Sequence, residues 1–394
     1  MYKSFFVLLG LTLCVGSLQA QQSSLDELLQ TVEANNQKLA AFRSYMESES
    51  WQYKGENKLP DPQASAFYLP FGEHNTGDYT EYQISQQFEF PTVYAARGNW
   101  IDEQEERLER EYQKLKQEIL LNAKELGLEL VYINKQRGLV EERVAQTQKV
   151  YGQVETLFEK GQTGILDRNK AKLVWLDQQF ALEELSTREM NIAQELQALN
   201  GGNEIDLVLT TYPNTIEIPT PDSLWNERLN QDAQIALLEQ EKQVAEQRLK
   251  VERNQLLPDI TAGYNYQGVA GSNYSGFYGG ISIPLWSGRS QVKMAEAEIN
   301  YFDKYMSEVI TSLKSDFTSQ VQRYQLLIKK FREYQQAMDG LNSEMLLQKS
   351  YELGEISFMD YYREVSFYRQ AENRMLEIEK ELQQLRAELF KHQL

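Results

Sequence analysis

The side chains that most often carry enzyme chemistry are scarce in this chain. Its 394 residues include two histidines, His74 and His392, and a single cysteine, Cys14. Zinc sites, thiol nucleophiles and histidine-based catalysis depend on these two residue types, so we expect no catalytic residue, no metal site and no bound cofactor. Ser272 and Ser275 stand in a glycine-rich stretch that does not open a helix, as a phosphate-binding loop would. An enzyme is the least favoured class.

Two carboxylates occupy matching places in a pair of related motifs. "GQTGILD" ends at Asp167 and "GEISFMD" ends at Asp360, and the motifs align Gly161 with Gly354. The offset between them is 360 − 167 = 193 residues. A glycine of this kind suits a chain reversal, and an aspartate just after a reversal suits the start of a helix.

The same offset relates other segments, which indicates an internal duplication. It places Pro91 on Pro284, and it carries Ile84, Phe88 and Phe90 onto Phe277, Ile281 and Ile283. We therefore predict a first repeat over 21–200 and a second over 222–394. The proline-rich segment 201–221 links them, with a short strand expected at 205–211.

The stretches between the prolines carry a helical rhythm of apolar residues. Steps of three and four predict a left-handed coiled-coil seam, and a shift near Phe317 and Val321 predicts local unwinding. A helix over about 92–160 would be on the order of 100 Å long at 1.5 Å per residue. Glycines at both motifs predict that each long helix turns back as a hairpin. The seam residues are Leu126, Leu130, Ile133, Val140, Val144, Tyr151, Val154 and Phe158 in the first repeat, and Ile299, Phe302, Met306, Val309 and Leu313 in the second.

Two segments alternate instead of following the helical rhythm. Residues 260–288 contain no Asp, Glu, Lys or Arg, although charged residues make up 25% of the chain. Apolar and polar residues alternate there and in the matching part of the first repeat, and alternating segments with flanking aromatics are typical of outer-membrane strands. An ordinary surface hairpin is the other interpretation. We predict four strands, near 63–71, 78–90, 259–267 and 277–283.

Four strands cannot close a barrel, and an open edge cannot lie in lipid. Single-chain barrels begin at eight strands, so at least two chains must combine. Two copies would give eight strands and three would give twelve. An eight-stranded barrel is filled by its own side chains, whereas a wider one leaves a pore.

The first twenty residues resemble an export signal. Lys3 precedes the apolar stretch 5–15, and Ala20 offers a small residue before a cleavage point. Lipidation of Cys14 is a weaker interpretation. The full chain has a formal charge of 40 − 58 = −18, and removal of 1–20 with Lys3 would give 39 − 58 = −19. So acidic a chain is a poor nucleic-acid binder.

Together these segments resemble the TolC-like outer-membrane efflux channels, also called outer membrane factors. The resemblance covers essentially all of 23–394 and rests on "YQISQQFEFPTVYAARGNW", "LPDITAGYNY…GGISIPLWSGR" and the two motifs that end at Asp167 and Asp360. It implies a mainly α-helical chain with membrane β-strands, which assembles as a homotrimer. The trimer would join a 12-stranded barrel in the outer membrane of a Gram-negative bacterium to a long periplasmic helical tunnel. It also implies two protein partners, a periplasmic adaptor and an inner-membrane pump.

The resemblance places the periplasmic entrance at 161–167 and 354–360. Asp167 and Asp360 would line or close that entrance, with helix capping an equally good interpretation of both. Some members carry an arginine two residues after the second glycine, where this chain has Ile356, so a gate clasped by that arginine is not expected. The tip residues that would touch the adaptor are Gly161, Gly164, Ile165, Gly354, Glu355, Ile356 and Ser357.

The cargo is the least determined part of the sequence-based interpretation. "FEFPTVYAARGNW" and the absence of a tail beyond Leu394 look more like channels paired with heavy-metal pumps of the resistance-nodulation-division class. Multidrug and type I secretion channels are the competing assignments, and an exported coiled-coil scaffold is a remote one. Each alternative makes different use of the acidic motifs, and the sequence leaves all of them open.

Overall fold

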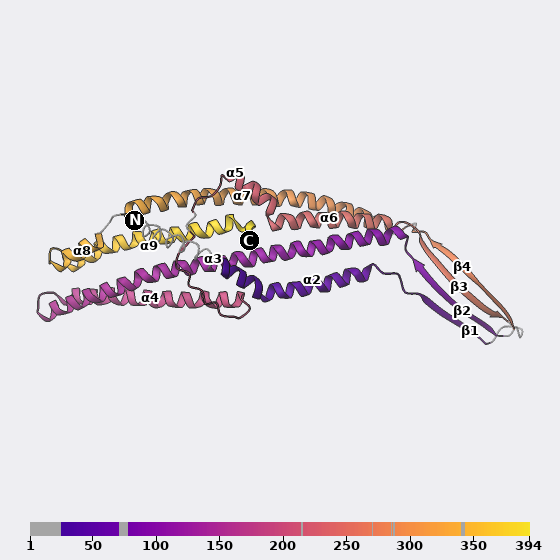
Figure 1. The fold of residues 1–394 in the computed structure, drawn as a ribbon, viewed down its shortest axis with the longest axis horizontal. Helices are drawn as coiled ribbons and strands as arrows, with labels where there is room; N and C mark the ends of the chain where they lie inside the picture. Colours follow the sequence, from indigo (N-terminus) through magenta and orange to yellow (C-terminus); the bar gives the residue numbers. More distant parts are fainter. Residues whose placement is uncertain are drawn as a thin grey trace, which may run out of the picture. The chain divides into compact units, whose positions relative to one another are not determined.

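The computed structural model describes residues 25–70, 78–213, 216–269, 271–284, 286, 288–339 and 343–394 (Figure 1). The predicted export signal at 1–20, with Cys14, and also His74 lie outside these residues. The chain is mainly α-helical with one sheet, as predicted. No helix in the described ranges combines the length and the apolarity needed to cross a membrane.

The first repeat is built on one very long helix. After the helical residues 25–35 come α2 (Gln37–Glu56), strands β1 (Gln63–Leu69) and β2 (Tyr79–Phe88), α3 (Pro91–Glu159) and α4 (Ile165–Leu199). Helix α3 has 69 residues, which confirms the helix predicted over 92–160. Pro91 is its first residue, where the missing N–H has no intrahelical partner to lose.

The second repeat follows the same order with one interruption. It comprises α5 (Pro221–Gln231), α6 (Ala233–Asn254), β3 (Asp259–Val269), β4 (Ser272–Ser282), α7 (Arg289–Met338), α8 (Ser343–Glu352), α9 (Phe358–Leu389) and the short η2 (Lys391–Gln393). In the second repeat α7 and α8 come before the turn, where the first repeat has α3, and residues 340–342 lie outside the described ranges.

The four strands form a single antiparallel sheet in the order β1-β2-β3-β4. Each repeat supplies one hairpin, and the hairpins join where β2 pairs with β3, for example Ile84 with Tyr264. The predicted strands are confirmed, with shifted ends. Strand β4 starts at Ser272 rather than 277, because Gly271 at φ 87° allows a tight turn directly before it.

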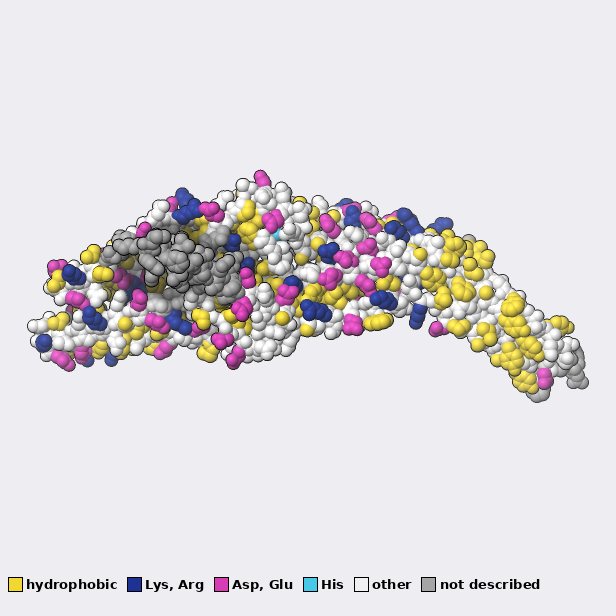
Figure 2. Space-filling view, in the orientation of Figure 1, with side chains coloured by type: hydrophobic (Ala, Val, Ile, Leu, Met, Phe, Trp, Pro, Cys, Tyr) yellow, Lys and Arg dark blue, Asp and Glu magenta, His cyan; other side chains and the backbone are white. Residues whose placement is uncertain are grey.

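The sheet has one apolar and one polar face, as the alternation predicted. The register places Tyr82, Ile84, Tyr264, Phe277 and Ile281 on the apolar face. Their exposed fractions run from 40% to 90%, so the described residues leave this face largely uncovered. Figure 2 shows hydrophobic side chains gathered over the strands. The polar face carries Glu81, Gln83, Asn265, Gln267 and Tyr278.

The helices pack along the predicted seams in two compact units. Among the described residues, one unit contains 25–40, 115–231 and 314–394, and the other contains 41–114 and 232–313. Each unit draws on both predicted repeats. Of the predicted seam residues, Ile133, Val140 and Val154 of α3 and Val309 of α7 are buried, and the others are half-buried. Phe317 and Val321, where the pattern shifts, are buried as well.

The linker forms no strand, so the strand predicted at 205–211 is wrong. Its residues are described and have no regular structure. Leu209 is 4% exposed, and its carbonyl accepts a hydrogen bond from Asn134 Nδ2 at 2.8 Å. The segment is therefore held by side chains of α3, which replace the ladder that a strand would need.

Candidate functional site

The two glycine motifs build the same backbone turn twice. Gly161 and Gly354 have φ values of 70° and 75°, a left-handed conformation that only glycine adopts without strain. Gly161 N–H donates to Phe158 O at 2.9 Å and Gln162 N–H to Leu157 O at 2.8 Å. In the second turn, which we call tip 2 (353–360), Gly354 and Glu355 make the equivalent bonds at 3.0 and 2.9 Å. Both turns end their helix with a Schellman motif. We call the first of these turns, residues 160–167, tip 1.

The helices that leave the tips begin differently. Gly164 is the N-cap of α4 and offers no side-chain cap, whereas Ser357 is the N-cap of α9 and accepts a hydrogen bond from Asp360 N–H at 3.2 Å. The Ser357 hydroxyl also donates to Asp360 Oδ2 at 2.7 Å. The Ser357 hydroxyl therefore caps α9 and also binds the carboxylate of Asp360.

The two candidate carboxylates therefore have different surroundings. Asp360 accepts a further hydrogen bond from Arg363 at 3.0 Å. The Ser357 hydroxyl, and then the Arg363 charge, hold the pKa of Asp360 below its usual value. Asp167 instead accepts a hydrogen bond from the neutral Thr163 hydroxyl at 3.1 Å. The capping interpretation fits Asp360, while Asp167 keeps a charge that this contact does not neutralise.

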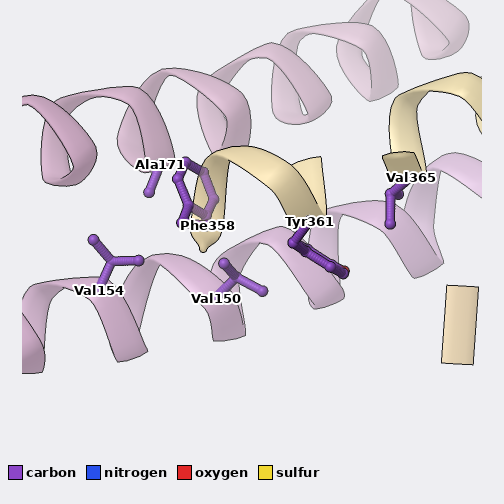
Figure 3. Close-up of a cluster of buried hydrophobic side chains, with 6 residues drawn as sticks. All are labelled: Val150, Val154, Ala171, Phe358, Tyr361 and Val365. Atoms are coloured by element: carbon purple, nitrogen blue, oxygen red, sulfur yellow. The ribbon is translucent and has the colours of Figure 1, made fainter. Parts of the chain in front are cut away.

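An aromatic and aliphatic cluster joins the two hairpins just behind the tips (Figure 3). Phe358 and Tyr361 of α9 lie against residues of α3 and α4. Tyr351 of α8 stacks on Tyr361 with ring centroids 5.3 Å apart. The buried members are Val150, Val154, Ala171, Phe358, Tyr361 and Val365. Burial of this cluster fixes tip 1 and tip 2 as neighbours.

A groove of about 510 Å³ opens between the tips. Asp167, Thr163 and Gln162 line it from tip 1, and Tyr351 and Ser357 line it from the second hairpin. The Tyr351 hydroxyl is buried without a hydrogen-bond partner among the described residues. Burial raises the pKa of Tyr351, and the nearby Asp167 charge adds to that rise.

Two buried arginines, Arg143 of α3 and Arg369 of α9, fasten the same two hairpins farther along α3. Arg143 donates to Glu372 at 2.6 Å and to Asn373 at 3.0 Å. Arg369 donates to Gln146 at 2.7 Å and to Glu344 at 3.2 Å. Removing one partner of such a pair leaves an uncompensated charge, so these bonds restrict separation of the hairpins.

The structure separates the predicted tip residues into four groups. Gly161 and Gly354 turn the chain, while Gly164 and Ser357 begin helices. Ile165 is 47% exposed, and Glu355 is also exposed. Ile356, which stands where an arginine gate would be, packs on the hydrophobic cluster. Their proposed contacts with another protein remain predictions.

Sequence reasoning missed the side chains that hold the tips together. Three of them, Tyr351, Phe358 and Tyr361, lie in or beside the second motif. Only Tyr351 has an aromatic residue, Phe158, at the matching position of the first hairpin.

Arg143 and Arg369 are buried among apolar residues of α3 and α9. Arg143 stands three residues after Val140, and Arg369 stands four residues after Val365. A basic residue at that spacing from an apolar one, with an acidic residue available on the facing helix, was the signal that could have identified them.

The tips offer surfaces and charge rather than reactive groups. Within the described residues, no three or more His, Cys, Asp or Glu side chains gather as metal ligands. The tips can bind another protein, close the space between them or guide a solute. The described side chains of the tips include no nucleophile paired with a base.

Comparisons with known proteins support the fold. No family model matches the chain, and no curated protein matches it. Solved structures are similar across 94% of it. CusC, studied for its transmembrane channel formation, has a TM-score of 0.76 at 15% identity, with 92% of that chain covered. The outer membrane protein VceC of Vibrio cholerae gives 0.73 at 17% identity and 96% coverage. The CmeC outer membrane channel of Campylobacter jejuni gives 0.70 at 14% identity and 85% coverage.

Proposed function

We propose that this protein is the outer-membrane channel of a tripartite efflux system in a Gram-negative bacterium. One observation carries the proposal: an open four-stranded sheet, apolar on one face, extends from long helical hairpins. An exposed apolar face of this kind needs a partner or a lipid environment. Polar residues on the opposite face suit a water-filled interior.

A homotrimer completes such a sheet. Strands β1 and β4 are the two edges of the described sheet, and an unpaired edge cannot lie in lipid. Pairing of β1 in one copy with β4 in the next closes a barrel, and three copies give twelve strands. Similarity to outer-membrane channels supports this number over eight, because twelve strands leave a pore.

The channel conducts passively and performs no chemistry. An inner-membrane pump supplies the energy, and a periplasmic adaptor binds the tips. The exposed residues Ile165 and Glu355 are the contact candidates that the structure favours. Opening requires the second hairpin to move away from the first, against the buried pairs of Arg143 and Arg369.

Heavy-metal cations are the proposed cargo, exported with a pump of the resistance-nodulation-division class. Acidic tips support a cation, because a ring of three carboxylates attracts cations and repels anions. Multidrug or type I secretion transport is the alternative. Two measurements on a deletion strain distinguish these cargoes: growth in the presence of metal salts or drugs, and assays of secreted proteins. Metal sensitivity alone supports the proposed cargo, and drug sensitivity alone supports the alternative.

Single-channel recording in lipid bilayers tests the channel and its entrance. We expect Asp167→Asn to lower the cation-to-anion permeability ratio by about threefold. Asp360→Asn should have a smaller effect, because Arg363 already offsets that charge. The matched control is Thr163→Ala, which removes the hydrogen bond to Asp167 but keeps the carboxylate.

Two outcomes would contradict the proposal. Unchanged selectivity in both aspartate variants would remove the tips as the charged entrance. A protein released from cells without detergent, with no conductance, would favour the exported scaffold.

A further inference from the structure

The polar face of the sheet contains one charged side chain away from the strand ends. The four strands contain only two charged residues, Glu81 in β2 and Asp259 at the start of β3. Glu81 lies on the face opposite Tyr82 and Ile84. No lysine or arginine in these strands can neutralise it.

Neutral donors hold the Glu81 carboxylate in one orientation. It accepts hydrogen bonds from Asn265 Nδ2 at 2.8 Å, from Gln267 Nε2 at 3.4 Å and from the Tyr79 hydroxyl at 2.5 Å. Two of these donors come from the neighbouring strand β3. The shell positions the carboxylate and leaves its negative charge in place.

The surroundings of Glu81 are open to solvent. A groove of about 490 Å³ runs over the polar face, lined by Glu81, Gln83, Asn265, Gln267, Tyr274 and Tyr278. Tyr278 lies across β3 because Gly263 has no side chain: a Cβ there would approach the ring to 2.5 Å. Gln83 donates a hydrogen bond to the Tyr278 hydroxyl. Amide and phenol groups therefore line the groove around a single carboxylate.

We infer that Glu81 is a selectivity-determining residue of the barrel, where three copies form a ring that binds hydrated cations in transit. The inference rests on the proposed trimeric channel and adds a second charged site to it, in the sheet rather than at the tips. Rings of acidic side chains favour cations and disfavour anions. A carboxylate that is held by amides and lacks a cationic partner keeps the full charge such a ring requires.

Bilayer recording of Glu81→Gln tests the inference. The amide keeps an acceptor for Asn265 and removes only the charge, so the trimer should assemble as in the wild type. We expect the cation-to-anion permeability ratio to fall about threefold. In Glu81→Gln/Gln83→Glu the charge moves two residues along the same face, and the ratio should recover. The matched control is Asp259→Asn, where a smaller change is expected at the strand end.

The outcomes separate the two proposals. Wild-type channels whose selectivity is unchanged in Glu81→Gln would overturn the role of Glu81 and leave the channel intact. A wild-type protein that forms no channel would overturn both. Selectivity that is lost in Glu81→Gln and not restored in Glu81→Gln/Gln83→Glu would show that the hydrogen-bonded network matters and the charge of the ring does not. That outcome also overturns the inference.

Discussion

Tip 1 and tip 2 have the same backbone and different side chains. Phe158 and Arg168 of the first hairpin correspond to Tyr351 and Tyr361 of the second. Arg168 lies over the Phe158 ring at 5.2 Å and pairs with Glu155 at 2.8 Å, whereas the two tyrosines stack and Tyr361 is buried. The two tips share the turn that glycine geometry allows, while charged side chains flank the turn in tip 1 and aromatic side chains pack beside it in tip 2.

The largest expected difference between the tips is in how much an alanine substitution lowers the free energy of unfolding at one pair of equivalent positions. Phe358 is 8% exposed and Ile165 is 47% exposed. We expect Phe358→Ala to lower the free energy of unfolding by about 3 kcal/mol, because it leaves a cavity in the cluster. Ile165→Ala should change it by less than about 0.5 kcal/mol. Thermal unfolding, followed by the helical circular dichroism signal, measures the stability change in both variants. Equal losses of stability would mean that assembly covers Ile165.

The glycines should show no difference between the tips. Gly161→Ala and Gly354→Ala each force a side chain into the left-handed region, which costs about 1–2 kcal/mol. A Cβ at either position meets no atom within 4 Å, so steric clashes add nothing. The same unfolding measurement applies, with Gly152→Ala, seven residues before the end of α3, as a control expected to be neutral or stabilising. Unequal losses at the two tips would mean that one turn is held by an additional contact.

The smallest expected effect on either tip concerns acid. The pKa of Asp360 is lower in the folded chain than its ordinary value of about 4. Its contribution to stability is therefore complete above that value and is lost as the pH falls through the depressed pKa. Amide exchange in the first turn of α9, corrected for intrinsic rates, should accelerate below about pH 4 relative to the first turn of α4. Asp360→Asn should abolish the dependence, and persistence in that variant would assign it to another group.

The sequence predicted the features that a repeated local pattern determines. Glycine at 161 and 354 predicted both turns, and the alternation from Tyr82 to Phe88, broken only at Gln86, predicted a two-faced strand. The start of β4 was missed because Ser272 and Asn273 have low strand propensity and gain their pairing from Val269 and Gly268 of β3. This pairing lies at the turn of the β3–β4 hairpin, and the propensities of the two residues taken singly do not include it.

The site was less predictable than the fold. Asp167 and Asp360 were equivalent in sequence, and their difference arises from Thr163 on one side and Arg363 on the other. The burial of Phe358 depends on α3, which lies some two hundred residues away along the chain. Glu81 is an ordinary charged residue in the sequence, and only the strand register brings Asn265 and Gln267 to it.

The pairing of β2 with β3 has a consequence for the order of folding. Ile84 and Tyr264 are neighbours in the sheet, yet the whole first helical hairpin and the linker separate them in the chain. The local hairpin β1-β2 can form early, but the sheet cannot grow until the second repeat has been synthesised, and contacts of such long range form slowly. During that interval β2 presents a free edge to any other strand. A nascent chain of this design therefore needs protection from aggregation until its own second half arrives.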